Sequence, residues 1–149
     1  MKLFTDGGCT NQMDPDHSKR VMRIVVTDEN GTVLVNKIKT GGSNNVAELW
    51  AVTEALLYVK NCELPANQKI ADVFTDSTNT LAWIDGRVGD NINDKKAVSH
   101  LLTAVYRLRE KVNLTVTWIP RKKNVAGIFM ERNPVERSRC LPPAGTLSR

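Results

Sequence analysis

The sequence predicts an α/β domain with a five-stranded mixed sheet and helices on both faces. Three observations predict this class. Three β-rich segments joined by turns open the chain, two long segments with helical periodicity follow, and each of these precedes a further β-rich segment. Strands that return through helices extend a hairpin sheet in parallel, so the predicted element order is βββαβααβα.

The N-terminal part predicts an antiparallel meander. Its strands are rich in β-branched and aromatic residues and lie at residues 2–6, 21–27 and 32–38. The first strand is expected to stop at Asp6, before a polar, turn-rich stretch at residues 9–20. The sequence Asp-Glu-Asn-Gly at residues 28–31 is a strong turn signal and joins the second and third strands as a hairpin.

After Gly42 the hydrophobic period changes from that of strands to that of helices. The predicted elements are an amphipathic helix at 45–61, a strand at 70–75, a short helix ending near 84, a helix at 95–111, a strand at 114–119 and a last short helix. Ser77 or Thr78 can cap the first short helix, and Asn124 can cap the last one.

The 149-residue length fits one domain, which we place at residues 1–133, followed by a basic and flexible C-terminal tail at residues 134–149. Residues 1–120 carry 14 basic and 14 acidic side chains, whereas residues 121–149 carry seven basic and two acidic ones. A basic end on a neutral body indicates either a polyanionic partner or a solvated tail.

Composition excludes several classes of protein. The three cysteines are scattered, which argues against a disulfide framework or a zinc site. The two histidines, His17 and His100, give little support to imidazole-based nucleophilic triads. No apolar run is long enough to span a membrane, and no apolar stretch precedes Asp6. We therefore expect a cytoplasmic monomer without membrane association or a required protein partner.

Acidic residues occur where two predicted strands end. Asp6 closes the first strand, Asp76 closes the fourth, and Glu48 lies in the first turn of the helix after the third. If the two strands are parallel neighbours, their carboxyl ends meet at one edge of the sheet, where α/β proteins bind ligands. Three carboxylates at one place repel unless a cation neutralises them, and oxygen ligands suit Mg²⁺ or Mn²⁺.

Each acid also has a local explanation. Asn45 and Glu48 have the spacing of a capping box, in which the Glu reaches back to the start of the helix. Asp76 can favour the dipole of the following short helix, and Asp6 can belong to a turn. The joint placement of three acids by separate elements favours the metal site over these separate readings.

Four segments together resemble type 1 ribonuclease H. They are Phe-Thr-Asp-Gly-Gly at 4–8, Ser-Asn-Asn-Val-Ala-Glu-Leu at 43–49, Val-Phe-Thr-Asp-Ser at 73–77 and Val-Thr-Trp-Ile-Pro at 116–120. Each segment alone is a weak signal, whereas the four in this order and spacing are specific. The resemblance covers about residues 1–133 and implies the ribonuclease H-like fold, in agreement with the element order above.

The resemblance also implies an endonuclease that hydrolyses the RNA strand of RNA–DNA hybrids, leaving 5′-phosphate and 3′-hydroxyl ends. Asp6, Glu48 and Asp76 are the implied ligands of two Mg²⁺ ions, for which Mn²⁺ can substitute. Two such ions about 3.5–4 Å apart activate the attacking water and stabilise the leaving oxygen.

Substrate-binding residues follow from the same resemblance. Asn44 and Asn45 correspond to the residues that sense 2′-hydroxyls, the group that distinguishes RNA from DNA. Ser43 corresponds to the hydroxyl residue that seats a phosphate of the DNA strand. Trp83 either lines the DNA channel or belongs to the core. The remaining members of the expected substrate-binding set are Gly8 and Cys9.

The sequence departs from the family pattern at the last helix. The position of the family's fourth acid is occupied by Ile128. We expect Asn124 to be the fourth catalytic and metal-ligating residue through its amide oxygen. Glu131, or no fourth ligand with Asn124 as a plain helix cap, are the alternatives.

Two basic features of relatives are also absent. The flexible-loop histidine is missing, and Lys122 or Lys123 can take over its part in product release. The basic protrusion of many bacterial relatives is missing as well, which assigns the grip on the hybrid to the C-terminal tail.

Other functions remain open at this point. A junction resolvase or a 3′–5′ exonuclease shares acids at strand ends, and a hybrid-binding module with a weakened site is consistent with the altered fourth ligand. An actin-like ATPase needs two domains, and no phosphate-binding glycine motif is present.

Overall fold

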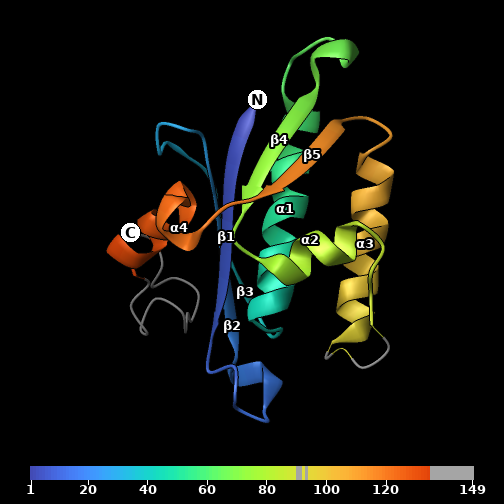
Figure 1. Ribbon diagram of the computed structural model, residues 1–149. Coiled ribbons are helices and arrows are strands. Elements are labelled where there is room, and N and C mark those ends of the chain that lie inside the picture. The colour runs from blue at the N-terminus through green and yellow to red at the C-terminus, as the bar shows by residue number, and fades with distance from the viewer. Residues whose placement is uncertain (90–91, 93, 135–149) are drawn as a thin grey trace.

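The chain is described by a computed structural model that covers residues 1–89, 92 and 94–134. The predicted tail, from residue 135 onward, lies outside this range. The five-stranded sheet of the domain has the order β3-β2-β1-β4-β5 (Figure 1). The strands are β1 (Lys2–Thr10), β2 (Val21–Thr27), β3 (Val33–Thr40), β4 (Ile70–Thr75) and β5 (Asn113–Trp118).

The sheet is mixed, as predicted. β1, β2 and β3 pair as an antiparallel meander, whereas β4 pairs in parallel with β1 and with β5. In the described part of the chain, three short 3₁₀ turns occur in connections, at η1 (His17–Lys19), η2 (Ala66–Gln68) and η3 (Arg121–Lys123). The parallel pairing of β1 and β4 is the feature on which the predicted meeting of Asp6 and Asp76 depends.

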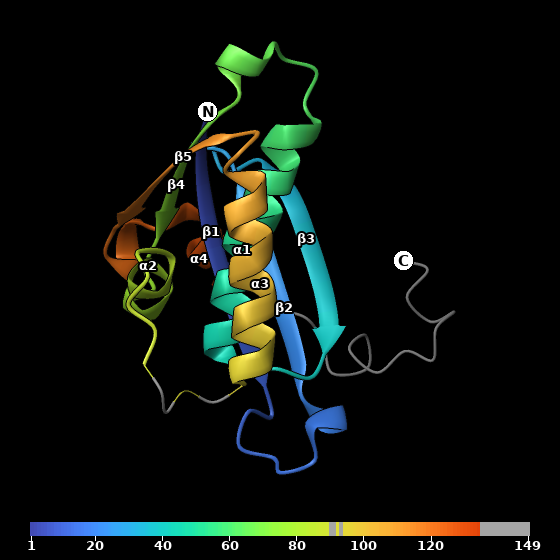
Figure 2. The ribbon, with the colours of Figure 1, turned by 90° about the vertical axis from the view of Figure 1, so that its right-hand side faces the viewer.

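Helices cover both faces of the sheet, which confirms the predicted architecture. They are α1 (Asn44–Asn61), α2 (Thr78–Ile84), α3 (Lys95–Leu108) and α4 (Val125–Arg132). α1 packs on one face with α3 outside it, and α4 packs on the opposite face against β1 and β2 (Figure 2).

α1 is the central helix of the core. Its buried residues are Val46, Ala47, Leu49, Ala51, Val52, Thr53, Ala55, Leu56 and Val59. They occupy most of its circumference because the helix lies between the sheet and α3. A helix that is apolar nearly all round is a buried one, so the amphipathic pattern expected for this segment is wrong.

The end of β1 differs from its predicted position for a physical reason. β1 continues to Thr10 instead of stopping at Asp6, because it remains paired with β2 as far as Thr10 opposite Val21. Its parallel pairing with β4, however, ends at Phe4 opposite Phe74. Asp6 therefore lies two residues beyond the point where β1 and β4 separate, which is the edge that the sequence indicated.

The two thiols within the described part of the chain, Cys9 and Cys62, are free. Cys140 lies outside that part. Among the helices that the structure describes, none has both the length and the apolar character required to cross a bilayer.

Gly7 lies at a close approach between β1 and α1. A Cβ atom at this position would lie 2.5 Å from the carbonyl carbon and oxygen of Ala47. Those atoms belong to the backbone of α1, so a side chain at residue 7 cannot be accommodated by a rotamer change. Gly7 is therefore required for the packing of α1 on the sheet.

We expect Gly7→Ala to lower the free energy of unfolding by about 3 kcal/mol or more, because it overpacks a rigid backbone contact. Denaturant titration followed by circular dichroism measures the change. Gly8→Ala is the matched control, since its Cβ would find its nearest neighbour at 3.8 Å, an ordinary contact distance. Equal stabilities for the two variants would contradict the importance of the Gly7 contact.

Candidate active site

Three carboxylates from separate elements converge at the carboxyl edge of the sheet. Asp6 comes from β1, Glu48 from α1 and Asp76 from the residue after β4. Each offers an oxygen, and these oxygens all lie within 4.8 Å of one another. We refer to Asp6, Glu48 and Asp76 as the carboxylate cluster. The structure thus brings together the three acids that the sequence singled out.

Glu48 reaches the cluster through a contact with β1. Its Oε1 accepts a hydrogen bond of 2.7 Å from the backbone N–H of Gly7. The helix is capped instead by Ser43, whose Oγ accepts from the N–H of Val46 at 3.2 Å. The capping-box reading of Asn45 and Glu48 is therefore wrong, because the N-cap lies two residues earlier and Glu48 binds another element.

Burial and mutual repulsion perturb the cluster. Burial raises the pKa of Glu48 to about 10, and the charges of Asp6 and Asp76 act in the same direction. The pKa of Asp6 rises to about 6, again mainly by burial, with Asp76 adding to the shift. A hydrogen bond between Glu48 and Asp6 favours the ionised form of Asp6 and the protonated form of Glu48. Without a cation, the folded site therefore keeps a proton.

The cluster fits a divalent cation on chemical grounds. It supplies only carboxylate oxygens, which are the preferred ligands of Mg²⁺ and Mn²⁺. A doubly charged ion would replace the retained proton and offset the repulsion that raises the pKa of Asp6 and Glu48. Asp6, Glu48 and Asp76 are the residues that would hold it.

Asn124 is fully buried beside the cluster and caps α4, as the sequence predicted for this helix. Its Oδ1 accepts from the N–H of Ala126 at 3.2 Å. Its Nδ2 donates to Oδ2 of Asp76 at 3.0 Å and to the carbonyl of Thr5 at 2.9 Å. The amide oxygen is thus engaged in the cap, and the amide nitrogen orients the Asp76 carboxylate.

The first turn of α4 approaches Asp6 without contributing an acid. A Cβ atom on Gly127 would lie 3.2 Å from Oδ2 of Asp6, so a small residue suits this position. The next residue, Ile128, is half-buried. Glu131 is exposed and pairs with Arg121 at 3.5 Å.

Two residues that sequence reasoning did not assign to the site lie next to it. The charge of Arg121, in η3, lowers the pKa of Asp6. Trp118, at the end of β5, is 45 % exposed and donates its indole N–H to the backbone carbonyl of Asp76 at 3.2 Å. Only topology could have identified them from the sequence, because β5, which ends at Trp118 and precedes Arg121, runs parallel to β4.

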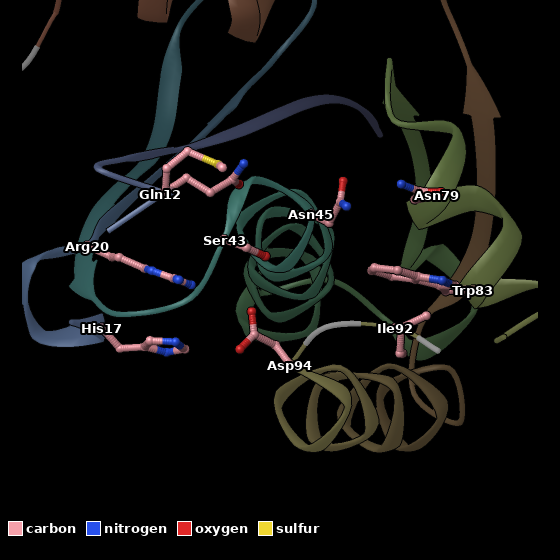
Figure 3. Close-up of a pocket in the computed structure, with 10 residues that line it drawn as sticks. Gln12, His17, Arg20, Ser43, Asn45, Asn79, Trp83, Ile92 and Asp94 are labelled. Atoms are coloured by element: carbon pink, nitrogen blue, oxygen red, sulfur yellow. The ribbon is translucent and has the colours of Figure 1, made fainter. Parts of the chain in front are cut away.

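The predicted substrate-binding residues divide into two groups. Ser43, Asn45 and Trp83 line a cavity of about 650 Å³ between α1, α2 and the connection from β1 to β2 (Figure 3). Trp83 also belongs to the hydrophobic core and is only 6 % exposed, which confirms its core reading, whereas its place in a DNA channel stays a prediction.

Asn44 and Cys9 contact each other instead of lining this cavity. Oδ1 of Asn44 accepts from the backbone N–H of Cys9 at 2.7 Å and joins α1 to β1. Gly8 lies next to these two residues, since a Cβ atom on it would lie 3.9 Å from the same Asn44 oxygen. The amide nitrogen of Asn44 forms no hydrogen bond within the described chain and is available to a ligand.

In the absence of metal, Glu48→Gln should stabilise the fold above neutral pH by about 1–3 kcal/mol, within the usual range for one substitution. A carboxyl whose pKa is raised by folding binds its proton more tightly in the folded state. The contribution of each such carboxyl to the stability of the fold is therefore fully favourable below about pH 4. It is lost as pH rises through the folded pKa, which is about 6 for Asp6 and about 10 for Glu48. Thermal unfolding in a chelator between pH 5 and pH 9 tests this.

Glu63→Gln, an exposed glutamate outside the cluster, is the control and should unfold like the parent protein. Added Mg²⁺ should stabilise the parent more than the Glu48→Gln variant. If the chelated parent and the Glu48→Gln variant have the same pH profile, the repulsion at the cluster is not significant.

Comparison with known proteins shows the family and the fold of the chain. The RNase H family model matches residues 1–130 of the chain. The chain has no match among curated proteins. Its fold is similar to that of an N-terminal RNase H domain from Mycobacterium tuberculosis, with a TM-score of 0.61 and 21 % identity, covering 84 % of this chain and 90 % of that one.

Two structures of LC11 RNase H1, isolated from compost by a metagenomic approach, are also similar. One has a TM-score of 0.64 and 23 % identity, covering 87 % of this chain and 90 % of that chain. The other, in complex with an RNA/DNA hybrid, has a TM-score of 0.59 and 24 % identity, covering 83 % and 87 %. With the family match and the five-stranded mixed sheet, these similarities confirm the type 1 resemblance, and the chain belongs to the RNase H family.

Proposed function

We propose that this protein is an endonuclease that hydrolyses the RNA strand of RNA–DNA hybrids with two divalent metal ions. The observation that carries the proposal is the carboxylate cluster at the sheet edge of an RNase H family chain. The LC11 RNase H1 structure with a bound hybrid supports the same substrate for this fold. The expected products carry 5′-phosphate and 3′-hydroxyl ends.

Each residue of the site has a distinct part in this proposal. Asp6, Glu48 and Asp76 would hold the ions, Mg²⁺ with Mn²⁺ as substitute. When bound, the ions would supply an activated water and charge stabilisation at the leaving oxygen. Asn124 positions Asp76 through its Nδ2, and we assign it this part because its Oδ1 already caps α4. Arg121 adds positive charge near Asp6.

Substrate recognition is assigned to residues near the start of α1. Ser43 and Asn45 line the cavity between α1, α2 and the connection from β1 to β2, where a DNA-strand phosphate would sit. Asn44 presents a free amide nitrogen to a 2′-hydroxyl or a minor-groove base edge. This placement favours a hybrid substrate over those of a resolvase or an exonuclease.

A second candidate is a hybrid-binding protein with weakened cleavage. It is favoured by one observation, the presence of Ile128 where the family pattern has its fourth acid. The two functions differ in turnover and not in the kind of nucleic acid that is bound.

We expect Asp76→Asn to reduce cleavage of a labelled RNA–DNA hybrid by about 10³-fold or more. The reason is that the charge of one metal-holding carboxylate would contribute several kcal/mol to stabilising the transition state, and each 1.36 kcal/mol is tenfold in rate. The assay uses hybrid, double-stranded RNA and single-stranded DNA with Mg²⁺ or Mn²⁺. Cleavage of single-stranded DNA instead of hybrid would support the exonuclease reading.

Asp72→Asn is the control, because Asp72 lies on the same strand but outside the cluster. It should cleave at the parent rate. Undiminished cleavage by Asp76→Asn would show that the metal site has been assigned to the wrong residues. Hybrid binding without cleavage by the parent protein would favour the second candidate.

Removal of residues 134–149 should weaken hybrid binding by about threefold to tenfold at low salt and flatten its salt dependence, because phosphate contacts by basic side chains release counterions. The removed segment carries three arginines and one glutamate. Equilibrium binding over a salt series measures both effects. A full-length variant with Arg137, Arg139 and Arg149 changed to Gln should behave like the truncation, and parent-like affinity in both would contradict the contribution of the tail.

A further inference from the structure

The cavity lined by Ser43 and Asn45 contains charges of both signs. Arg20 and His17, from the connection between β1 and β2, lie on one side of Ser43, and Asp94 lies near Ser43 at the start of α3 (Figure 3). Trp83 forms the opposite wall. The guanidinium of Arg20 suits a phosphate-binding site, whereas a carboxylate opposes one. Asp94 therefore needs an explanation.

Arg20 is held rigidly at the cavity. Its Nε donates to the carbonyl of Asp14 at 2.9 Å and its Nη1 to the carbonyl of Gly42 at 3.1 Å. Both acceptors are neutral, so the positive charge is not offset by an ion pair within the described chain. The guanidinium is thus fixed in place with its Nη2 free to bind an anion.

Asp94 has no structural partner that accounts for its carboxylate. It precedes α3 but makes no side-chain hydrogen bond to cap the helix, and its φ of 58° is a left-handed conformation. Its Oδ2 is buried and has no hydrogen-bond partner among the residues that the structure describes. Neither helix capping nor an ion pair explains the acid at this position.

The two opposite charges both lie near Ser43 at the cavity (Figure 3). Arg20 lowers the pKa of the Cys9 thiol, whereas Asp94 raises it, so both lie close enough to Cys9 for their charges to be felt. They form no ion pair with each other within 4.0 Å. An anion bound by Arg20 would therefore also experience the charge of Asp94.

We propose that Asp94 is a counter-charge that limits the affinity of this cavity for a nucleic-acid phosphate drawn in by Arg20. The proposal rests on the proposed function, because the phosphate belongs to a strand of the bound nucleic acid. Repulsion by a partly buried carboxylate weakens the grip on substrate and product alike. Asp94 thereby lowers the affinity for the bound strand and speeds its exchange.

The experiment compares Asp94→Asn with Asp85→Asn in equilibrium binding of a labelled RNA–DNA hybrid. A chelator is present, so that cleavage does not interfere. Asn preserves size and tolerates the left-handed conformation. Asp85 caps the end of α2, is exposed and pairs with Arg87, so its substitution removes the same charge from the same connection outside the cavity.

Asp94→Asn should bind about threefold to tenfold more tightly at low salt, with the gain shrinking as salt rises. Asp85→Asn should change affinity less than twofold. Equal affinities for the two variants, or weaker binding by Asp94→Asn, would overturn the proposal. In an Arg20→Gln background, shown to be folded by circular dichroism, the gain should largely disappear. A gain that persists there would also overturn it.

These outcomes are separate from those that test hydrolysis. A parent protein that binds hybrid without cleaving it would refute the proposed endonuclease activity and leave the charge effect measurable. If the parent cleaves hybrid, Asp94→Asn should lower KM and, where strand release limits turnover, also lower kcat. If Asp94 had a merely structural role, Asp94→Asn would change thermal stability and leave KM unchanged.

Discussion

The contact between Gly7 and α1 is the constraint on which the site depends. Because Gly7 has no side chain, the backbone of α1 comes close enough for Glu48 to accept the Gly7 N–H at 2.7 Å. This bond links two elements far apart in sequence, while Ser43 caps the helix locally. The same region of β1 is where pairing with β4 ends, so Asp6 and Asp76 face the space that α1 enters. Backbone packing therefore assembles the carboxylate cluster before any ion is considered.

The cluster is costly for the metal-free fold, and its neighbours offset that cost only in part. Burial raises the pKa of both Asp6 and Glu48, and the charge of Arg121 acts against this rise at Asp6. Asn124 adds a hydrogen bond to Asp76 without adding a positive charge. An arrangement that is unfavourable without a cation is expected of a site selected for binding ions, since the binding energy is then available to stabilise the fold.

Much of the fold and of the carboxylate cluster could be predicted from the sequence, because both depend on local periodicity and on one rule of topology. Strand ends carrying Asp6 and Asp76 meet if their strands are parallel neighbours, and no side-chain detail is needed for that step. Glu48 was harder, because its spacing from Asn45 also fits a capping box; the competition was decided by the N–H of Gly7, which is 41 residues away. Arg121, Trp118 and Asp94 were missed as site residues because their significance lies in tertiary contacts that no local pattern encodes.

The carboxylate cluster and the cavity with Arg20 act in opposite directions on a polyanionic ligand. The carboxylate cluster repels a phosphate until cations neutralise it, whereas Arg20 attracts one without any cofactor. Residues 1–120 carry no net charge, so in that part of the chain attraction for a polyanion would come from a local arrangement such as this one and not from the overall field. A strand seated by the cavity but released easily can align its partner with the cluster and still dissociate after reaction. An acid beside the anchoring arginine is consistent with that balance, because maximal affinity at the cavity would hold product as firmly as substrate.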